Sequence, residues 1–588
     1  MKYLVKLILK MRILKPISVA MIAAMTLASC SSTKTATSNA TKEITIITAT
    51  DSIIAKKGEM SDADVKSWPH MDVFTDSVPG MSLAKAYDFV KNKKGTTVIV
   101  GVIDSGIDVE HEDLKDVAWV NEDEIANNGK DDDNNGYVDD IHGWNFLGGE
   151  KGQSNPEQLE MTRMVKKWMP RFDGKSADSI AKEDKDDFEL FVKLKKIIDQ
   201  KNASAENQLR NAENQKYQYS AVKQIIKKAK DTITKLLGQK VFNLENINSL
   251  TIVDPELLQG KMTIMRILDT GATIEEAYEQ FDEIIDRSNY IIDHYSSQLN
   301  SQYKIDFNGR LAGDDPYDIT DSNYGNPYVS GSKDDESHGT HVSGIIAASR
   351  NNGIGMNGVA HNVKIMAIRA VPDGDEYDKD VALAIRYAVD NGAKVINMSF
   401  GKGYSPNVQW VYDAIKYAES KDVLLVSGAG NDESDMDTTD SFPNDSKDKL
   451  VEFADNFLTV GAMTRHFDEK LVSSFSNYGK LNVDIFAPGS EIYSTYPKDE
   501  YESIQGTSMA SPEVAGVAAL VRSYYPNLTA SQVKHIIMNS GIEFSKEVIK
   551  PSKRGSDPVK VKFEELSVSG RILNAYNALL MAEKMTTK

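Results

Sequence analysis

A run of apolar residues that ends in a carboxylate constrains the fold most strongly. Residues 98–103 read VIVGVI, and Asp104, Ser105 and Gly106 follow directly. An uninterrupted apolar run of this length is typical of a strand that is buried on both faces, as in a parallel sheet. Because ligands bind at the carboxyl ends of such strands, we expect Asp104 to lie where chemistry takes place.

Similar apolar runs recur later in the chain, at residues 364–370, 393–398 and 423–426. Between them lie patterns typical of helices, at residues 380–391 and 408–420. This alternation predicts an α/β fold with a doubly wound, mostly parallel sheet and helices on both faces.

A long segment interrupts this alternation. Residues 175–237 contain neither Gly nor Pro, which indicates helix, and a second helical pattern covers residues 274–295. We therefore expect an all-α insertion over residues 151–310, packed as hairpins or a small bundle. Its role is open between a subdomain that covers the scaffold and a lid over the substrate. Seven apolar residues at three- and four-residue spacings form one helical stripe: Val222, Ile225, Ile226, Ala229, Ile233, Leu236 and Leu237.

Two further segments outside the insertion carry residues that can do chemistry. Residues 337–344 read SHGTHVSG and residues 506–512 read GTSMASP, and each opens a helical pattern. A serine hydroxyl is a weak nucleophile until a base takes its proton, and the base needs a carboxylate to orient it. Asp104, His338 and Ser508 could supply these three parts.

The segments VIDSGID, HGTHVSG and GTSMASP resemble, in the same order, the three signature motifs of the subtilisin-like serine peptidases. The resemblance covers residues 68–150 and 311–588, which we expect to form the two parts of one catalytic domain. It implies a serine endopeptidase that acts through an acyl-enzyme and needs no cofactor for its chemistry. It also implies that Asp104 orients the base, that His338 is the general base and acid, and that Ser508 is the nucleophile.

The resemblance extends to residues expected at the substrate. Residues 424–432 read LLVSGAGND and resemble the family segment that carries the oxyanion-hole asparagine, which implies this role for Asn431 and a place beside it for Gly430. Ser399, Phe400 and Gly401 resemble the segment whose backbone pairs with an extended peptide substrate. Polypeptides are therefore the expected substrates.

Other classes of function stay open at this stage. A catalytically inactive pseudoprotease would use the same cleft only to bind peptides, and an esterase or amidase would use the same triad on small molecules. His338 and His341 are three residues apart and suggest a zinc pair as a further alternative, but no HExxH pattern accompanies them.

An acidic segment suggests a metal site. Residues 131–140 read DDDNNGYVDD, which matches the start of an EF-hand-type loop. The twelfth position is His142 rather than the usual glutamate, so a complete EF-hand is not expected. A structural Ca²⁺ and a solvated acidic turn are the two alternatives. The candidate calcium ligands are Asp131, Asp133, Asn135 and Asp139.

The amino-terminal residues resemble an export signal. Residues 1–30 combine basic residues, a short apolar run and the ending LASC, which resembles a bacterial lipobox with Cys30 as the lipidated residue. Residues 31–67 are expected to be a flexible tether. We therefore expect an exported protein that is anchored in the bacterial cell envelope by lipid alone, with contact to the membrane through that lipid.

Composition excludes several other functions. The chain has 68 Lys and Arg against 87 Asp and Glu, a net charge of -19, so no nucleic-acid partner is expected. Cys30 is the only cysteine, which rules out an intramolecular disulfide and cysteine-rich zinc or iron–sulfur sites.

Overall fold

The computed structural model describes residues 46–48, 53–331 and 336–587. These residues form two compact units. One unit contains Gln200–Leu299, and the other contains the described residues of Ile44–Asp199 and Asn300–Lys588. The helix α6 (Lys185–Leu237) begins in the second unit and ends in the first.

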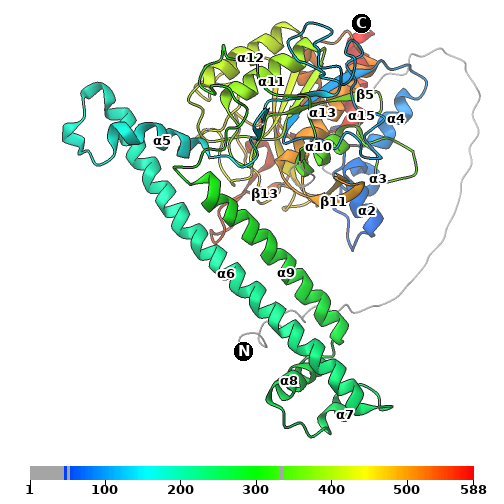
Figure 1. Cartoon of the computed structure of the whole chain (residues 1–588). Helices are drawn as coiled ribbons and strands as arrows, with labels where there is room; N and C mark the ends of the chain where they lie inside the picture. Colours follow the sequence, from blue (N-terminus) through cyan, green and yellow to red (C-terminus); the bar gives the residue numbers. More distant parts are fainter. Residues whose placement is uncertain (1–45, 49–52, 332–335, 588) are drawn as a thin grey trace, which may run out of the picture. The chain divides into compact units, whose positions relative to one another are not determined.

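A nine-stranded sheet is the centre of the larger unit, within the described residues (Figure 1). Its strands are parallel except for the pair β12–β15. In spatial order they are β12 (Ile542–Glu543), β15 (Arg571–Ile572), β9 (Ile485–Pro488), β8 (Phe457–Met463), β7 (Leu424–Gly428), β6 (Val395–Met398), β1 (Val98–Asp104), β5 (Val363–Arg369) and β2 (Gly143–Asn145). The predicted α/β fold with a mostly parallel sheet is confirmed.

The two faces of the sheet are covered by different hydrophobic clusters. Val98, Val100 and Val102 of β1 belong to one cluster, while Ile103 and the partly buried Ile99 belong to the other. Successive side chains of a strand point to opposite faces, so the continuous apolar run of β1 reflects burial on both sides.

Different helices pack on these faces. The helices α11 (Asp378–Asp390) and α12 (Val408–Ser420) pack together on one face (Figure 1). On the other face, α13 (Thr507–Tyr524) contacts β6, β7, β8 and β9, and α10 (Ser337–Ala347) packs against α13 and β1. Two of the three sequence motifs thus open the helices α10 and α13, which lie on the same face.

Further helices and three hairpins complete the larger unit, within the described residues. They are the helices α2 (Asp62–Ser67), α3 (Val73–Asp76), α4 (Leu83–Val90), α5 (Glu160–Phe172), α14 (Ala530–Ser540) and α15 (Ala575–Thr586), with the hairpins β3 (Gly148–Gly149)–β4 (Gly152–Gln153), β10 (Ile492–Tyr496)–β11 (Glu500–Ile504) and β13 (Glu547–Ile549)–β14 (Lys560–Lys562).

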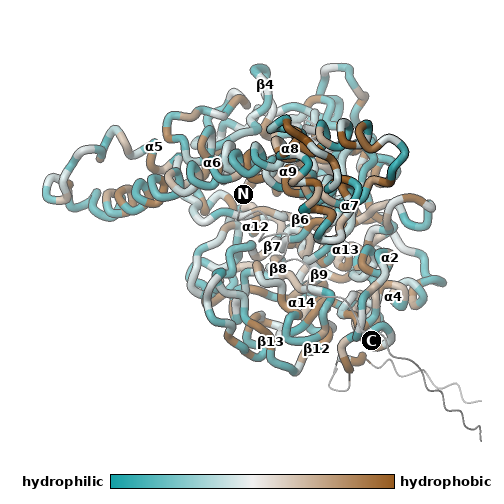
Figure 2. Tube along the Cα trace, turned by 90° about the horizontal axis from the view of Figure 1, so that it is seen from below, coloured by the Kyte–Doolittle hydropathy of each residue, from teal (hydrophilic) through white to brown (hydrophobic). Residues whose placement is uncertain are grey.

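The smaller unit is helical. After α6 come α7 (Leu244–Asn248), α8 (Pro255–Asp269) and α9 (Ile274–Ser297). In α9 the side chain of Thr273 accepts from the backbone of Glu276, and Glu276 caps Thr273 in return. Hydrophobic residues alternate with hydrophilic ones along α6 (Figure 2). Residues of the predicted stripe, including Ile226, Ala229 and Ile233, form the core of this unit.

Three expectations differ from the structure. Leu236 was placed in the apolar stripe, but 55% of it is exposed, whereas its neighbour Leu237 is buried in the core of this unit. The helical insertion was expected over residues 151–310, but residues 151–199 and 300–310 belong to the unit that contains the sheet.

The tether was expected to reach residue 67, but its residues 53–67 are instead folded onto the larger unit. The helix α2 ends at residue 67, and Ser61 caps its start, since the Ser61 hydroxyl accepts from the backbone N–H of Asp64. Ile53 and Met60 pack against the core, and the backbone oxygen of Ile47 accepts from the side chain of Asn577. Residues 31–42 are polar, whereas Ile47, Ile53 and Met60 are apolar and contact the larger unit, so the composition of residues 31–42 did not predict the structure of the residues after them.

Candidate active site

Three neighbouring strands deliver candidate residues to the same edge of the sheet. Asp104 is the last residue of β1, Ser399 follows β6, and Asn431 lies three residues after β7. These strands are adjacent in the order β7, β6, β1 and run parallel. Since neighbouring strands lie about 4.8 Å apart, their carboxyl ends fall within roughly 10 Å.

Asp104 and His338 form a hydrogen-bonded pair. The Oδ1 atom of Asp104 lies 2.7 Å from Nδ1 of His338, and Oδ1 also accepts from the backbone N–H of Ser105 at 2.7 Å. The Asp104 side chain is 2% exposed, whereas that of His338 is 37% exposed. The pair therefore has a buried carboxylate and an imidazole that a substrate can reach.

The electrostatics of this pair favour the protonated imidazole. Burial lowers the pKa of His338, but the charge of Asp104 and the hydrogen bond to it outweigh burial and raise that pKa above its usual value. The second carboxylate oxygen of Asp104 is buried and has no hydrogen-bond partner in the described part of the chain. Asp104 is thus placed to stabilise a positive charge on His338.

Ser508 lies in the first turn of α13. Its Oγ donates to the backbone oxygen of Ser399 at 3.1 Å, and its own backbone oxygen accepts from Oγ of Ser399 at 2.9 Å. Among the residues that the structure describes, no hydrogen bond joins Ser508 to His338. The structure therefore shows the Asp104–His338 link directly, and Ser508 in contact with the segment after β6.

Asn431 has an orientation that suits donation. Its side-chain oxygen accepts from the backbone N–H of Thr507 at 2.9 Å and from the Thr507 hydroxyl at 3.2 Å. Because the oxygen is held by Thr507, the amide nitrogen points elsewhere, and it lies 3.6 Å from the position that a Cβ on Gly506 would occupy. The nitrogen is thus presented beside the start of α13.

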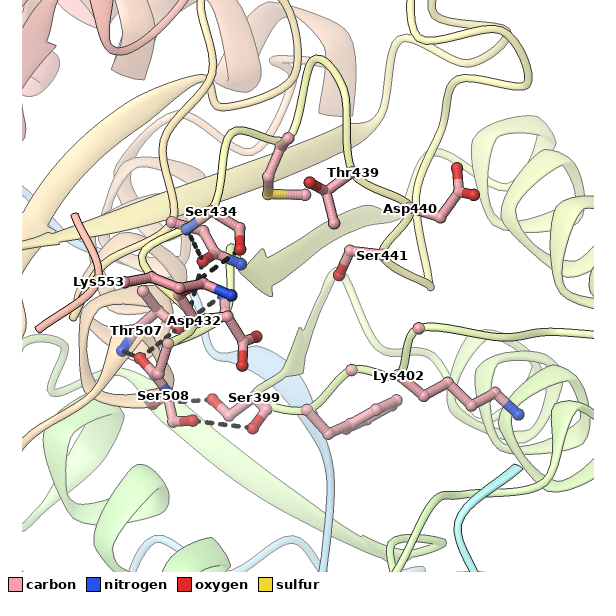
Figure 3. Close-up of a pocket in the computed structure, with 18 residues that line it drawn as sticks. Ser399, Lys402, Asp432, Ser434, Thr439, Asp440, Ser441, Thr507, Ser508 and Lys553 are labelled. Atoms are coloured by element: carbon pink, nitrogen blue, oxygen red, sulfur yellow. Dashed lines mark hydrogen bonds between the residues drawn. The ribbon is translucent and has the colours of Figure 1, made fainter. Parts of the chain in front are cut away.

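One cavity of about 570 Å³ brings most of these residues together (Figure 3). It is lined by the predicted residues Ser399, Phe400, Gly401, Gly430, Asn431 and Ser508. Asp104 and His338 are not among its lining residues. The cavity also has lining residues that sequence reasoning did not select: Lys402, Gly403, Gly428, Asp432, Ser434, Met436, Thr439, Asp440, Ser441, Asn477, Thr507 and Lys553.

Asn477 is the most informative of the missed residues. Its side-chain oxygen accepts from the backbones of Asp432 and Ser434, and its side-chain nitrogen donates to the oxygen of Ala429. It thereby fixes the loop that carries Asn431. Gly430 has φ +102°, and a Cβ there would meet Asn477 at 2.5 Å, so this position requires glycine. No local pattern marks Asn477, since its partners are more than 40 residues away.

The second histidine of this motif, His341, has a structural environment. Nε2 of His341 lies 3.0 Å from the oxygen of Ile492 and 3.1 Å from that of Glu502, and burial lowers the pKa of His341 to about 3. Since both neighbours are acceptors, Nε2 carries the proton and holds the β10–β11 hairpin. This arrangement gives no support to a zinc pair of His338 and His341.

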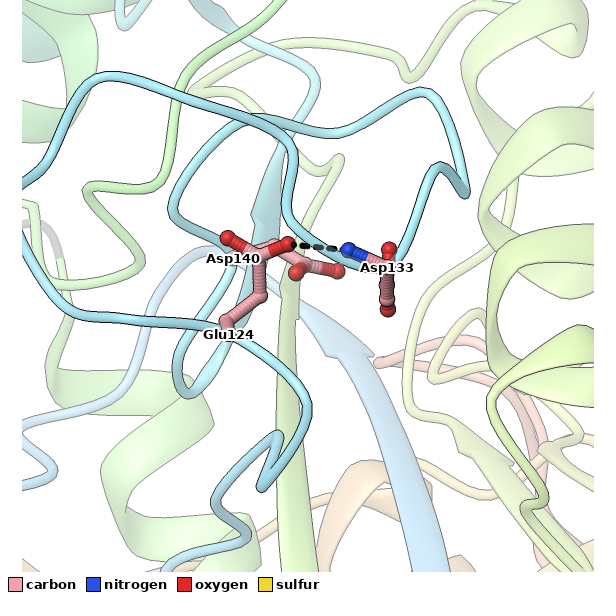
Figure 4. A group of neighbouring side chains, drawn as sticks. All are labelled: Glu124, Asp133 and Asp140. Atoms are coloured by element: carbon pink, nitrogen blue, oxygen red, sulfur yellow. Dashed lines mark hydrogen bonds between the residues drawn. The ribbon is translucent and has the colours of Figure 1, made fainter.

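The acidic loop assembles a set of carboxylates that differs from the predicted one (Figure 4). Oxygen atoms of Glu124, Asp133 and Asp140 lie within 4.8 Å of one another. The carboxylates of Asp131 and Asp139 instead accept backbone N–H groups of the loop. The predicted ligand Asp133 is therefore joined by two residues that the spacing did not select.

These groups fit a hard cation. All three members of the cluster offer carboxylate oxygens, the ligand type that Ca²⁺ prefers. Burial raises the pKa of Asp140 to about 6, and the charge of Asp133 adds to this effect against hydrogen bonds from Tyr387, Asn121 and Asn135. Asn135 donates its amide nitrogen to Asp133 and Asp140, so in this structure it does not present its side-chain oxygen to the cluster. Ca²⁺ binding stays a prediction.

The predicted signal segment and Cys30 lie outside the described residues. Among the helices that are described, none combines the length and the hydropathy needed to cross a membrane.

Comparison with known proteins identifies the family. The sequence model of the Subtilase family matches residues 260–562. The chain is 41% identical to thermitase from Thermoactinomyces vulgaris over 209 residues, which is 35% of this chain and 68% of thermitase. It is 39% identical to subtilisin DY from Bacillus licheniformis over 216 residues, 36% of this chain and 73% of that protein. A thermophilic serine proteinase from Bacillus sp. (strain AK1) is 40% identical over 208 residues, 35% of this chain but 46% of that protein.

These matches define the class of enzyme as the subtilisin-like serine endopeptidases. This chain belongs to the subtilase family. The match spans less than half the length of the proteinase from strain AK1. The family model begins at residue 260, so Asp104 is supported by its hydrogen bond to His338 and not by that match.

Proposed function

We propose that this protein hydrolyses peptide bonds in polypeptides through an acyl-enzyme, with Asp104, His338 and Ser508 as the catalytic triad. The observation that carries the proposal is the 2.7 Å hydrogen bond between the buried Asp104 and the accessible His338. A carboxylate on Nδ1 holds the imidazole in the tautomer that leaves Nε2 able to accept a proton.

In the first step Ser508 attacks the carbonyl carbon of the substrate. Its Oγ turns away from the oxygen of Ser399 and gives its proton to Nε2 of His338, while a bond forms from Oγ to carbon. The imidazolium that results is stabilised by the charge of Asp104. His338 then gives the proton to the leaving amine as the C–N bond breaks, and water releases the acyl group by the same steps.

The charge on the substrate oxygen needs hydrogen-bond donors. Asn431 is placed to donate its amide nitrogen, since Thr507 occupies the amide oxygen. The backbone N–H of Ser508 supplies a second donor, because N–H groups in the first turn of a helix have no intrahelical acceptor.

The cavity favours a peptide over a small molecule. Ser399, Phe400 and Gly401 follow β6 along one wall of it, where their backbone can pair with an extended chain. Polypeptide substrates are therefore favoured over small esters.

A fluorophosphonate probe tests this function directly. The probe should label the wild-type protein and not Ser508→Ala. Ser490→Ala is a matched control, because Ser490 is a buried serine that bonds to Ser473 and does not line the cavity. Labelling of Ser508→Ala at the wild-type level would refute the assignment. Labelling together with no cleavage of any member of a peptide library would favour a small-molecule hydrolase.

We further propose that the protein is exported and carries a lipid on Cys30, which would anchor it in the bacterial cell envelope. The support is the sequence of residues 1–30, with its basic start, apolar run and LASC ending. Metabolic labelling with a fatty acid should mark the wild type and not Cys30→Ser.

We also propose that the acidic loop binds a structural Ca²⁺ with the carboxylates of Glu124, Asp133 and Asp140. The support is the gathering of three carboxylates without a neutralising cationic side chain among them in the described structure. The ion would reduce the repulsion between them and would take no part in the peptidase chemistry.

A further inference from the structure

A buried lysine, Lys402, connects the proposed substrate cavity with the helix α5. Lys402 directly follows Ser399–Gly401 and lines the cavity, and its side chain is 2% exposed. Figure 3 shows the Lys402 side chain extending away from Ser399 and Ser508. The backbone of Lys402 therefore lies at the cavity, while its ammonium group points away from Ser399 and Ser508.

The backbone of Lys402 joins the two walls of the cavity. Its N–H donates to the oxygen of Phe442 at 2.9 Å, and its oxygen accepts from the N–H of Phe442 at 2.9 Å. Ser441, the neighbour of Phe442, lines the opposite wall. The position of Lys402 thus sets how far the segment 399–403 lies from the segment 439–442.

The ammonium group of Lys402 has three acceptors. Nζ lies 3.0 Å from Oε2 of Glu160, 2.8 Å from Oδ1 of Asp378 and 2.7 Å from the backbone oxygen of Glu376. The two carboxylate side chains are each 3% exposed. A charge buried among partners of this kind is held in one place, because no solvent is available to replace them.

Glu160 brings the helix α5 into this contact. It is the first residue of α5, its Oε2 also accepts from Arg163 at 2.5 Å, and its backbone N–H donates to Asp375 at 2.7 Å. Arg163 in turn donates to the backbone oxygens of Asp375 and Glu376. The first turn of α5 is thereby fixed to the loop before α11 and to Lys402 at the same time.

We propose that Glu160 and Lys402 are positioning residues for substrate binding, through which α5 holds one wall of the peptide cavity in its binding position. The proposal rests on the proposed function of that cavity. Neither side chain contacts Asp104, His338 or Ser508 in the described structure, so the pair acts on substrate affinity and not on the chemical step.

The test compares Lys402→Met and Glu160→Gln with the wild type on a series of peptides that differ in the residue before the cleaved bond. Lys402→Met keeps an unbranched side chain that is one atom shorter and removes the charge. KM should rise about tenfold and kcat should change by less than about twofold, since a loosened wall must be ordered by the substrate. Glu160→Gln should shift KM in the same direction, and the double variant should be little worse than Lys402→Met.

Lys379→Met is the matched control. Lys379 is also a buried lysine, with Nζ 2.6 Å from Asp314, but it does not line the cavity. Its loss should lower the melting temperature and leave KM unchanged. An equal rise of KM in Lys379→Met, or an unchanged KM in Lys402→Met, would overturn the proposal.

Titration with the fluorophosphonate probe counts folded active sites in each variant. If Lys402→Met yields no labelled protein, Glu160→Gln decides: a raised KM supports the proposal and an unchanged KM refutes it. Failure of the proposed function has a different signature, because the wild type itself would then cleave no peptide, whether or not the probe labels it.

Discussion

Replacing Asp104 by asparagine tests the electrostatic role of the buried carboxylate. The substitution keeps the shape of the side chain and removes a charge whose Oδ1 lies 2.7 Å from Nδ1 of His338. Two opposite charges about 4 Å apart attract by about 4 kcal/mol at an effective dielectric constant of about 20. That energy is available only once His338 is protonated in the transition state, so kcat should fall about a thousandfold.

A second effect adds to this loss. The asparagine amide can donate to Nδ1 of His338, which would place the imidazole proton on Nε2 and block the base, and the total loss would then approach about ten thousandfold. The assay is kcat for a chromogenic peptide, corrected for folded sites. Asp484→Asn is a suitable control, because Asp484 is a buried aspartate that accepts from the backbone of Thr459 away from the cavity. A loss smaller than about tenfold in Asp104→Asn would refute the reasoning.

Three further predictions follow from the site. Ser508→Ala and His338→Ala should each lower kcat by several orders of magnitude, and the double variant should be little worse in the same peptide assay, because the residues act as one unit. Asn431→Ala should lower kcat about 100- to 1000-fold with little change in KM, since its amide nitrogen faces charge that develops in the transition state. Without calcium, ionisation of Asp140 opposes folding because burial raises its pKa to about 6. In chelator, Asp140 should therefore lower the melting temperature as pH rises from about 4 to about 6, by an amount equivalent to roughly 3 kcal/mol at most.

Each of these predictions has an outcome that contradicts it. Losses that multiply in the double variant would show that Ser508 and His338 act separately. A raised KM with unchanged kcat would remove Asn431 from the oxyanion site. For the acidic loop, Asp140→Asn should reduce the pH dependence, and added Ca²⁺ should restore the melting temperature of the wild type. A melting curve that responds neither to chelator nor to Ca²⁺ would leave the loop as a solvated acidic turn.

Local periodicity predicted most of the elements that carry the site. The apolar run before Asp104 is β1, and the helical pattern at residues 408–420 is α12 with the same ends. Both patterns arise from burial that each segment experiences along its whole length, so they are visible in a short stretch of sequence.

Features built from distant residues were not predictable in this way. Glu124 reaches the acidic cluster because the chain folds back on itself, whereas an EF-hand pattern assumes ligands from one continuous loop. Asn477 holds the loop of Asn431 across 46 positions of sequence, and nothing near Asn477 marks that role.

Buried charges explain why the helix α5, within the expected limits of the helical insertion, belongs to the unit that contains the sheet. Charged residues are almost always at the surface unless they are paired. The sequence of a polar helix such as α5 therefore predicts a solvent-exposed helix that is separate from the sheet. In the structure Glu160 and Arg163 are both buried. Lys402, 242 positions after Glu160, bonds to Glu160, and Arg163 donates to Glu160 and to the backbone oxygens of Asp375 and Glu376. The pairing is a property of two segments together, and neither segment shows it alone. Where a helical segment joins a catalytic domain, sequence patterns therefore fail to predict that charged residues at the junction are buried. These same residues can link the segment to the active site.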